Sequence, residues 1–131
     1  MKKVISWIAA SIAAVIMLQT LYFKFSAAPE SVYIFSTLGL EPWGRIGSGV
    51  GELIASVLIL IPSLRWSGAL LGLGIISGAI FAHLTKLGIS VQNDGGYLFI
   101  LAIIVFGCCL ICLYLEKDKL KSMYARFFPT R

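Results

Sequence analysis

Residues 95–115 read GGYLFILAIIVFGCCLICLYL and contain no charged side chain. A run of this length matches a helix that crosses a hydrocarbon layer about 30 Å thick, because an α-helix rises about 1.5 Å per residue. Three further apolar runs of about this length occupy residues 4–23, 46–64 and 66–84. A backbone in lipid must satisfy its own hydrogen bonds, so runs rich in Val and Ile also become helices there. The sequence therefore predicts an all-α integral membrane four-helix bundle.

The composition of the whole chain agrees with this class. Of its 131 residues, 59% are hydrophobic and 13% are charged, and the mean hydropathy is +0.93. A soluble chain of this size could not hide so much apolar area in one core. We expect residues 1–131 to form a single membrane domain covered by the lipid bilayer. The net charge of +5 does not indicate nucleic acid, because the charges form no dense basic stripe with interleaved aromatic residues.

Lysine and arginine are distributed unequally between the two sides of this topology. With four spans, both termini and the loop between the second and third runs share one side, which holds Lys2, Lys3, Arg65, Lys117, Lys119, Lys121, Arg126 and Arg131. The other side holds Lys24, Arg45 and Lys86. Because cationic loops favour the cytoplasm, we expect both termini to be cytoplasmic, in a multi-pass protein of the plasma (cytoplasmic or inner) membrane. The basic tail, residues 116–131, would then lie near anionic headgroups.

A cleavable signal sequence is the alternative interpretation of the first run. Lys2 and Lys3 precede it, and Ser26-Ala27-Ala28 resembles a cleavage site. However, the run is longer than a signal core of about 7 to 15 residues. We therefore expect it to remain as a transmembrane helix.

The outer segment, residues 25–44, carries signals for a short helix. Pro29 suits a first helical position, Glu30 favours the positive helix end and Gly39 is a plausible stop. Apolar residues recur about every three positions, at Val32, Phe35 and Leu38. This spacing predicts an amphipathic helix on the outer face of the bundle, with a disordered loop as the alternative.

Small residues at four-residue spacing indicate where helices pack. They form three sets: Gly47, Gly51 and Ala55; Gly68 and Gly72; and Gly74, Gly78 and Ala82. Such ridges let helix backbones approach closely in lipid. We expect them to mark contact faces, either within one chain or between the copies of a homo-oligomer.

Ionisable side chains within the apolar runs are the candidate functional residues. Lys24 ends the first run, Glu52 lies about two turns inside the second and His83 is near the end of the third, all on the outer side. A lone carboxylate at that depth costs several kcal/mol, so Glu52 must be protonated, hydrated or paired with Lys24, His83 or Arg45. The wider candidate ligand-binding set is Gln19, Lys24, Arg45, Ser48, Glu52, Ser56 and His83.

Two interpretations of this polar cluster remain open. It is either a structural ion pair that fixes the helices or a polar pocket that opens to the outer leaflet and binds a ligand. Ser48, Glu52 and Ser56 are four residues apart, which places Glu52 on a polar stripe facing the bundle interior.

Other familiar chemistry is weakly represented. We predict no metal site, because one histidine cannot build a zinc or haem centre without ligands of other types. Cys109 and Cys112 have C-x-x-C spacing, with Cys108 adjacent, but an apolar helix stabilises no thiolate. We interpret these cysteines as small hydrophobic residues and keep a redox motif as the alternative. The sequence contains no complete catalytic motif, so enzymatic activity stays an open question.

A set of short motifs extends from Leu18 to Tyr114. They are Tyr22-Phe23-Lys24, Leu40-Glu41-Pro42, Gly51-Glu52-Leu53, the small residues from Gly68 to Ala79, and Ala82-His83. In these motifs the chain resembles the DoxX family of small four-helix membrane proteins and its relatives. It departs from the family at Leu21, where a glycine is expected before the lysine.

The resemblance implies a membrane partner of a quinone-linked or thiol-linked redox system, or a related subunit of envelope homeostasis. Lys24, Glu52 and His83 stand at the matching positions. We expect an outer-leaflet pocket that binds a small amphiphile, for which a quinone headgroup is one candidate, and a redox partner protein or a second copy as partner. The alternative is a non-catalytic assembly or chaperone-like accessory protein whose polar cluster is structural. A small transporter is disfavoured, because the sequence shows no duplicated halves.

Overall fold

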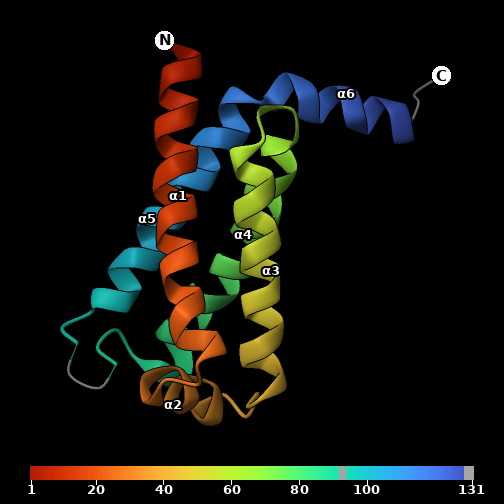
Figure 1. Ribbon diagram of the computed structural model, residues 1–131. Helices are drawn as coiled ribbons and strands as arrows, with labels where there is room; N and C mark the ends of the chain where they lie inside the picture. Colours follow the sequence, from red (N-terminus) through yellow and green to blue (C-terminus); the bar gives the residue numbers. More distant parts are fainter. Residues whose placement is uncertain (92–93, 129–131) are drawn as a thin grey trace.

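The computed structural model describes residues 1–91 and 94–128, and within them the regular secondary structure is entirely helical (Figure 1). The helices are α1 (Lys2–Phe25), α2 (Pro29–Thr37), α3 (Trp43–Leu60), α4 (Arg65–Ala82), α5 (Tyr97–Leu115) and α6 (Lys117–Phe127). A 3-10 turn, η1 (Pro62–Leu64), precedes α4, and a π-helical segment, η2 (His83–Leu87), follows it. Arg131, part of the predicted basic tail, lies outside the described residues.

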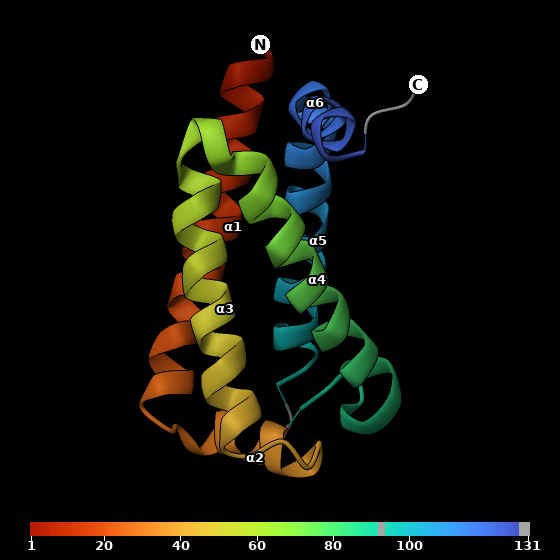
Figure 2. The same cartoon turned by 90° about the vertical axis from the view of Figure 1, so that its right-hand side faces the viewer.

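Four helical segments in the described part of the chain are long and apolar enough to cross a membrane: α1, α3, residues Pro62–Leu87 around α4, and α5. This confirms the prediction of an all-α protein with four such helices. The segments lie side by side as a bundle (Figures 1 and 2). Helix α1 packs against α3 and α5, and α4 packs against the same two helices.

Small side chains dominate the buried interior of the bundle. The residues with no exposed surface include Ala10, Ala13, Ala55, Ala69, Val105, Cys109 and Cys112. Larger apolar side chains point outward, and Val15, Val57 and Ile100 are all more than half exposed. A soluble protein rarely exposes so much contiguous apolar surface, whereas helices surrounded by lipid do. The distribution of side chains is therefore that of a membrane-spanning bundle.

Helices α3 and α4 approach each other closely at Gly68. A methyl group added there would lie 2.8 Å from the carbonyl oxygen of Ala55 and from the Cα atom of Ile59, so α4 meets the backbone of α3 directly. Gly47, Gly74 and Gly78 have no neighbouring atom within 4 Å of such a methyl group. The ridge of Gly68 and Gly72 is thus a contact face within the chain, and Gly51 and Ala55 pack there as well, while Gly47, Gly74 and Gly78 face away from the other helices.

Helix α2 lies across one end of the bundle (Figure 1). It occupies the segment in which the sequence predicts a short helix, and Pro29 stands in its first turn as expected. It contacts α1, α3 and η2. The N-terminus and α6 lie at the opposite end of the bundle (Figures 1 and 2).

Arg65 has a structural role at that opposite end. Its side chain is buried, with Nε donating to the carbonyl of Ile59 at 2.8 Å and Nη1 donating to the Ser6 hydroxyl at 2.9 Å. The guanidinium lies 4.2 Å from the centroid of the Trp7 ring, within the range of a cation–π contact. Arg65 therefore ties α1 to the turn between α3 and α4.

Candidate functional site

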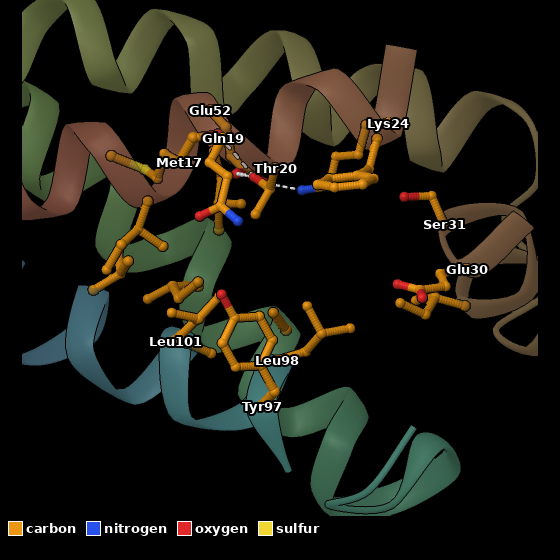
Figure 3. A pocket seen from close by; sticks show the side chains of 18 of the residues that line it. Met17, Gln19, Thr20, Lys24, Glu30, Ser31, Glu52, Tyr97, Leu98 and Leu101 are labelled. Atoms are coloured by element: carbon orange, nitrogen blue, oxygen red, sulfur yellow. Dashed lines mark hydrogen bonds and ion pairs between the residues drawn. The ribbon is translucent and has the colours of Figure 1, made fainter. Parts of the chain in front are cut away.

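A cavity of about 350 Å³ lies near the α2 end of the bundle (Figure 3). Its lining comes from α1, α2, α4 and α5, with Glu52 contributed by α3. A volume of this size is within the range of about 300 to 1,000 Å³ that is typical of small-molecule sites. Apolar side chains form most of the wall, including Ile16, Met17, Ile76, Leu101, Ala102 and Val105.

An ion pair between Lys24 and Glu52 forms the polar wall of the cavity. The Lys24 ammonium donates to Glu52 Oε1, and the Thr20 hydroxyl lies 2.8 Å from Oε2. The same hydroxyl is 2.8 Å from the carbonyl of Met17, so its single proton has two acceptors. The side chains of Lys24 and Glu52 are only 16% and 6% exposed. Of the partners considered for Glu52, the structure selects Lys24.

Arg45 forms its ion pair with Glu41 and not with Glu52. Its Nε donates to the two carboxylate oxygens of Glu41 at 2.8 and 3.0 Å, and its Nη1 donates to the backbone carbonyl of Lys24. Its guanidinium therefore ties the end of α1 to the start of α3, and Arg45 is not part of the cavity lining. Within the site its role is to position Lys24.

The two serines of the polar stripe make local bonds. The Ser48 hydroxyl donates to the carbonyl of Arg45 at 3.2 Å, and the Ser56 hydroxyl donates to that of Glu52 at 2.7 Å. Serine commonly bonds the preceding turn of its own helix in this way. Neither serine lines the cavity, whereas Gln19 does.

The His83 side chain contacts the end of the segment that it begins, η2. Its Nδ1 lies 3.0 Å from the carbonyl oxygen of Gly88, and its ring packs edge-on against Phe99 with centroids 5.6 Å apart. Gly88 ends η2 with a φ of +78°, a conformation that suits glycine. His83 is buried but does not line the cavity. The structure thus brings Gln19, Lys24 and Glu52 together at the cavity and places His83 at a different contact.

Five polar residues of the cavity were not among the predicted ligand-binding residues. They are Thr20, Glu30, Ser31, Asp94 and Tyr97. Thr20 was detectable, because it precedes Lys24 by four residues and so shares its helix face. Glu30, Asp94 and Tyr97 reach the site because α2 and the start of α5 lie at the same end of the bundle. No local sequence pattern predicts this arrangement. In Figure 3, Gln19 and Tyr97 project toward the cavity from α1 and α5.

Asp94 lies just before α5, outside the membrane-spanning segments. Its Oδ1 accepts from the backbone N–H groups of Val91 and Gly96 at 3.0 and 2.8 Å, and its Oδ2 accepts from Leu98 at 3.2 Å. Burial raises the pKa of this carboxyl group, but the backbone hydrogen bonds together outweigh burial and lower it below its usual range. Asp94 is therefore a fixed negative charge at neutral pH.

The polarity of the cavity changes along the bundle axis. Glu30, Lys24 and Asp94 lie toward α2, whereas Met17 and Val105 lie deeper in the bundle. Met17 and Lys24 are seven positions apart, which corresponds to a rise of roughly 10 Å along α1. The cavity therefore offers a polar end and an apolar end, as an amphiphile requires.

The three cysteines lie away from this site. Cys108, Cys109 and Cys112 are free and buried in the α5 interface, outside the cavity lining. Within residues 1–91 and 94–128, no group of three or more His, Cys, Asp or Glu side chains could hold a metal ion.

Comparison of the chain with models of protein families, with curated proteins and with solved structures gave no match. The likeness to the DoxX family is therefore one of short motifs. The chemistry of the site is therefore inferred from the residues that line it.

Proposed function

We propose that this chain is a membrane protein whose cavity binds a small amphiphile. The observation that carries the proposal is the 350 Å³ cavity with a buried Lys24–Glu52 pair at one end and an apolar wall at the other. A ligand headgroup would meet Lys24, Thr20 and Gln19, while its apolar part would lie between α1, α4 and α5. Apolar pockets with a few convergent polar groups are typical of ligand sites.

The proposed orientation places both termini and α6 in the cytoplasm and α2 at the outer surface of the plasma membrane. The excess of Lys and Arg at the end that holds the N-terminus and α6 supports it. The cavity then lies in the outer leaflet, with its polar end toward the headgroup region. A lipid-like ligand could enter without inverting its own orientation.

A quinone headgroup fits the donors at the polar end. The Lys24 ammonium has three N–H donors and gives one to Glu52, so further donors can reach a quinone carbonyl, as can the Gln19 amide. A bound quinone would supply electron-transfer chemistry, and the residues of this chain would bind and orient it. On the resemblance to the DoxX family, we place the protein in a redox or envelope-homeostasis system with a protein partner in the membrane.

A second function is favoured by one specific observation. Both oxygens of Glu52 already have partners within the chain, Lys24 and Thr20, so its charge is balanced without a ligand. A carboxylate paired in this way suits a non-catalytic assembly or accessory protein, in which it fixes α1 against α3.

Quantifying amphiphiles that copurify with the protein distinguishes these functions. We expect a stoichiometric ligand in the wild type. It should be lost in Glu52→Gln and in Ala102→Phe, whose larger side chain would fill the apolar part of the cavity. Glu116→Gln, at the far end of the bundle, is the matched control and should retain it. If no preparation carries a ligand and Glu52→Gln lowers only thermal stability, the accessory function is the better one.

A further inference from the structure

We infer that the ligand of this cavity carries a positive charge, as an amine or quaternary ammonium headgroup on a short apolar chain. This inference rests on the amphiphile-binding function proposed above. It assigns a positive charge to the ligand and so replaces the neutral quinone as the candidate headgroup. It follows from the balance of charges at the polar end of the cavity.

Four charged side chains line the cavity in the described part of the chain: Lys24, Glu30, Glu52 and Asp94. Lys24 and Glu52 neutralise each other within their ion pair. Moving a proton from the ammonium to the carboxylate would leave that balance unchanged. Glu30 and Asp94 remain, so the lining has a net charge of two negative units.

The two remaining carboxylates approach the cavity from different elements. Glu30 stands in the first turn of α2, and in Figure 3 its side chain points toward the cavity. Asp94 lies before α5, and its three backbone hydrogen bonds hold it in place. A carboxylate accepts about four hydrogen bonds, so Asp94 keeps capacity for a ligand donor.

The nearby cations do not offset this charge. Arg45 is paired with Glu41, and His83 contacts the carbonyl of Gly88. Neither of them, nor Lys86 on η2, is part of the cavity lining. An anionic headgroup would therefore meet two carboxylates and a lysine that is already paired. Glu30 is exposed and Asp94 is half-buried, so water screens part of their field, but a lining of net negative charge still disfavours an anion and favours a cation.

Aromatic rings at the same end provide a second source of attraction for a cation. Phe23, Phe35 and Tyr97 line the cavity, and Figure 3 shows the Tyr97 ring directed into it. The face of an aromatic ring attracts alkylammonium groups, and desolvation strengthens the effect. The polar end thus combines carboxylates with aromatic rings, the pair of features that recognises organic cations.

Three probes with one tail and different headgroups test the inference: octyltrimethylammonium, octanol and octyl sulfate. Binding to the full chain in nanodiscs of zwitterionic lipid is measured by equilibrium dialysis. We expect the cation to bind at least about tenfold more tightly than the anion, a difference of about 1.4 kcal/mol. Ala102→Phe should weaken binding of both the cation and the alcohol, because it narrows the apolar wall that they share.

The decisive variant removes the carboxylates of Glu30 and Asp94 together. Glu30→Gln with Asp94→Asn should weaken binding of the cation about tenfold and leave octanol unchanged. The matched control, Glu116→Gln with Asp118→Asn, makes the same change in net charge at the far end of the bundle and should have no effect. Glu30→Gln alone serves if the loss of Asp94 prevents folding, and should weaken cation binding about threefold.

The outcomes separate the two proposals. If octanol and octyl sulfate bind as tightly as the cation and Ala102→Phe weakens all three, the charge inference fails while the amphiphile site stands. Equal loss of cation binding in the two charge variants also overturns it, because the effect is then one of overall protein charge. If none of the probes binds, or Ala102→Phe has no effect on any, the amphiphile site fails and the inference fails with it.

Discussion

Replacing Glu52 by glutamine should destabilise the protein strongly, although the change removes only one charge. The Lys24 side chain is only 16% exposed, and its ammonium would lose its carboxylate partner. Removing one member of a buried ion pair typically costs about 3 to 5 kcal/mol. Lys24 lies at the end of α1 and can extend toward the headgroup region, which relieves part of that cost. We expect a loss of about 2 to 4 kcal/mol.

Equilibrium unfolding in mixed neutral and anionic detergent, followed by circular dichroism, measures this loss. Glu116→Gln is the matched control, because it breaks a pair with Lys119, whose side chain is 49% exposed. An exposed pair contributes at most about 1 kcal/mol. The double variant Lys24→Met with Glu52→Leu should recover much of the stability, since apolar replacement of a buried pair is often neutral. The opposite result would refute the reasoning: Glu52→Gln loses no more stability than the control, and the effects of Lys24→Met and Glu52→Leu simply add in the double variant.

Three other predictions concern packing, pH and topology. Gly68→Ala should destabilise the bundle by about 1 to 3 kcal/mol, because the added methyl group meets backbone atoms of α3, whereas Gly74→Ala should be neutral or stabilising in the same unfolding assay. Asp94 should stabilise the folded protein above the pKa of an unfolded aspartate, near 3.9, and this contribution should disappear as the pH falls through its lower folded pKa. The difference in melting temperature between wild type and Asp94→Asn should therefore shrink in acid, and a constant difference would contradict it. In a cysteine-free background, an impermeant maleimide added to intact cells should label Glu30→Cys and spare Ser122→Cys, and the reverse pattern would invert the proposed orientation.

The sequence was sufficient for the four apolar helices and for α2, because each has a local signal, but it did not predict α6 (Lys117–Phe127) within the basic tail. The apolar runs at 4–23 and 95–115 correspond to α1 (Lys2–Phe25) and α5 (Tyr97–Leu115), and the Pro29 signal correctly located α2. The third run was predicted to end at residue 84, whereas helical structure continues as η2 to Leu87. These boundaries follow from hydropathy and helix-start residues.

Only the ion pair of the site was predictable, because few cations were available to a buried carboxylate. A buried Glu52 needed a cation, and Lys24 was available at a matching depth. Arg45 and His83 were equally plausible from sequence, but Glu41 lies one helical turn from Arg45, and the π-helical turn directs His83 to Gly88. The cavity itself depends on how five helices are placed, so its lining could not be read from any local pattern.

Photolabelling with an amphiphile that carries a diazirine in its tail tests the existence of the binding site most directly. After irradiation of the protein in nanodiscs, mass spectrometry identifies the modified residues. We expect labels at Met17, Leu101 and Val105, and their loss in Ala102→Phe. Labels confined to outward-facing residues such as Val15 and Ile104, unchanged by that substitution, would show that the amphiphile contacts only the lipid surface and that the cavity binds none.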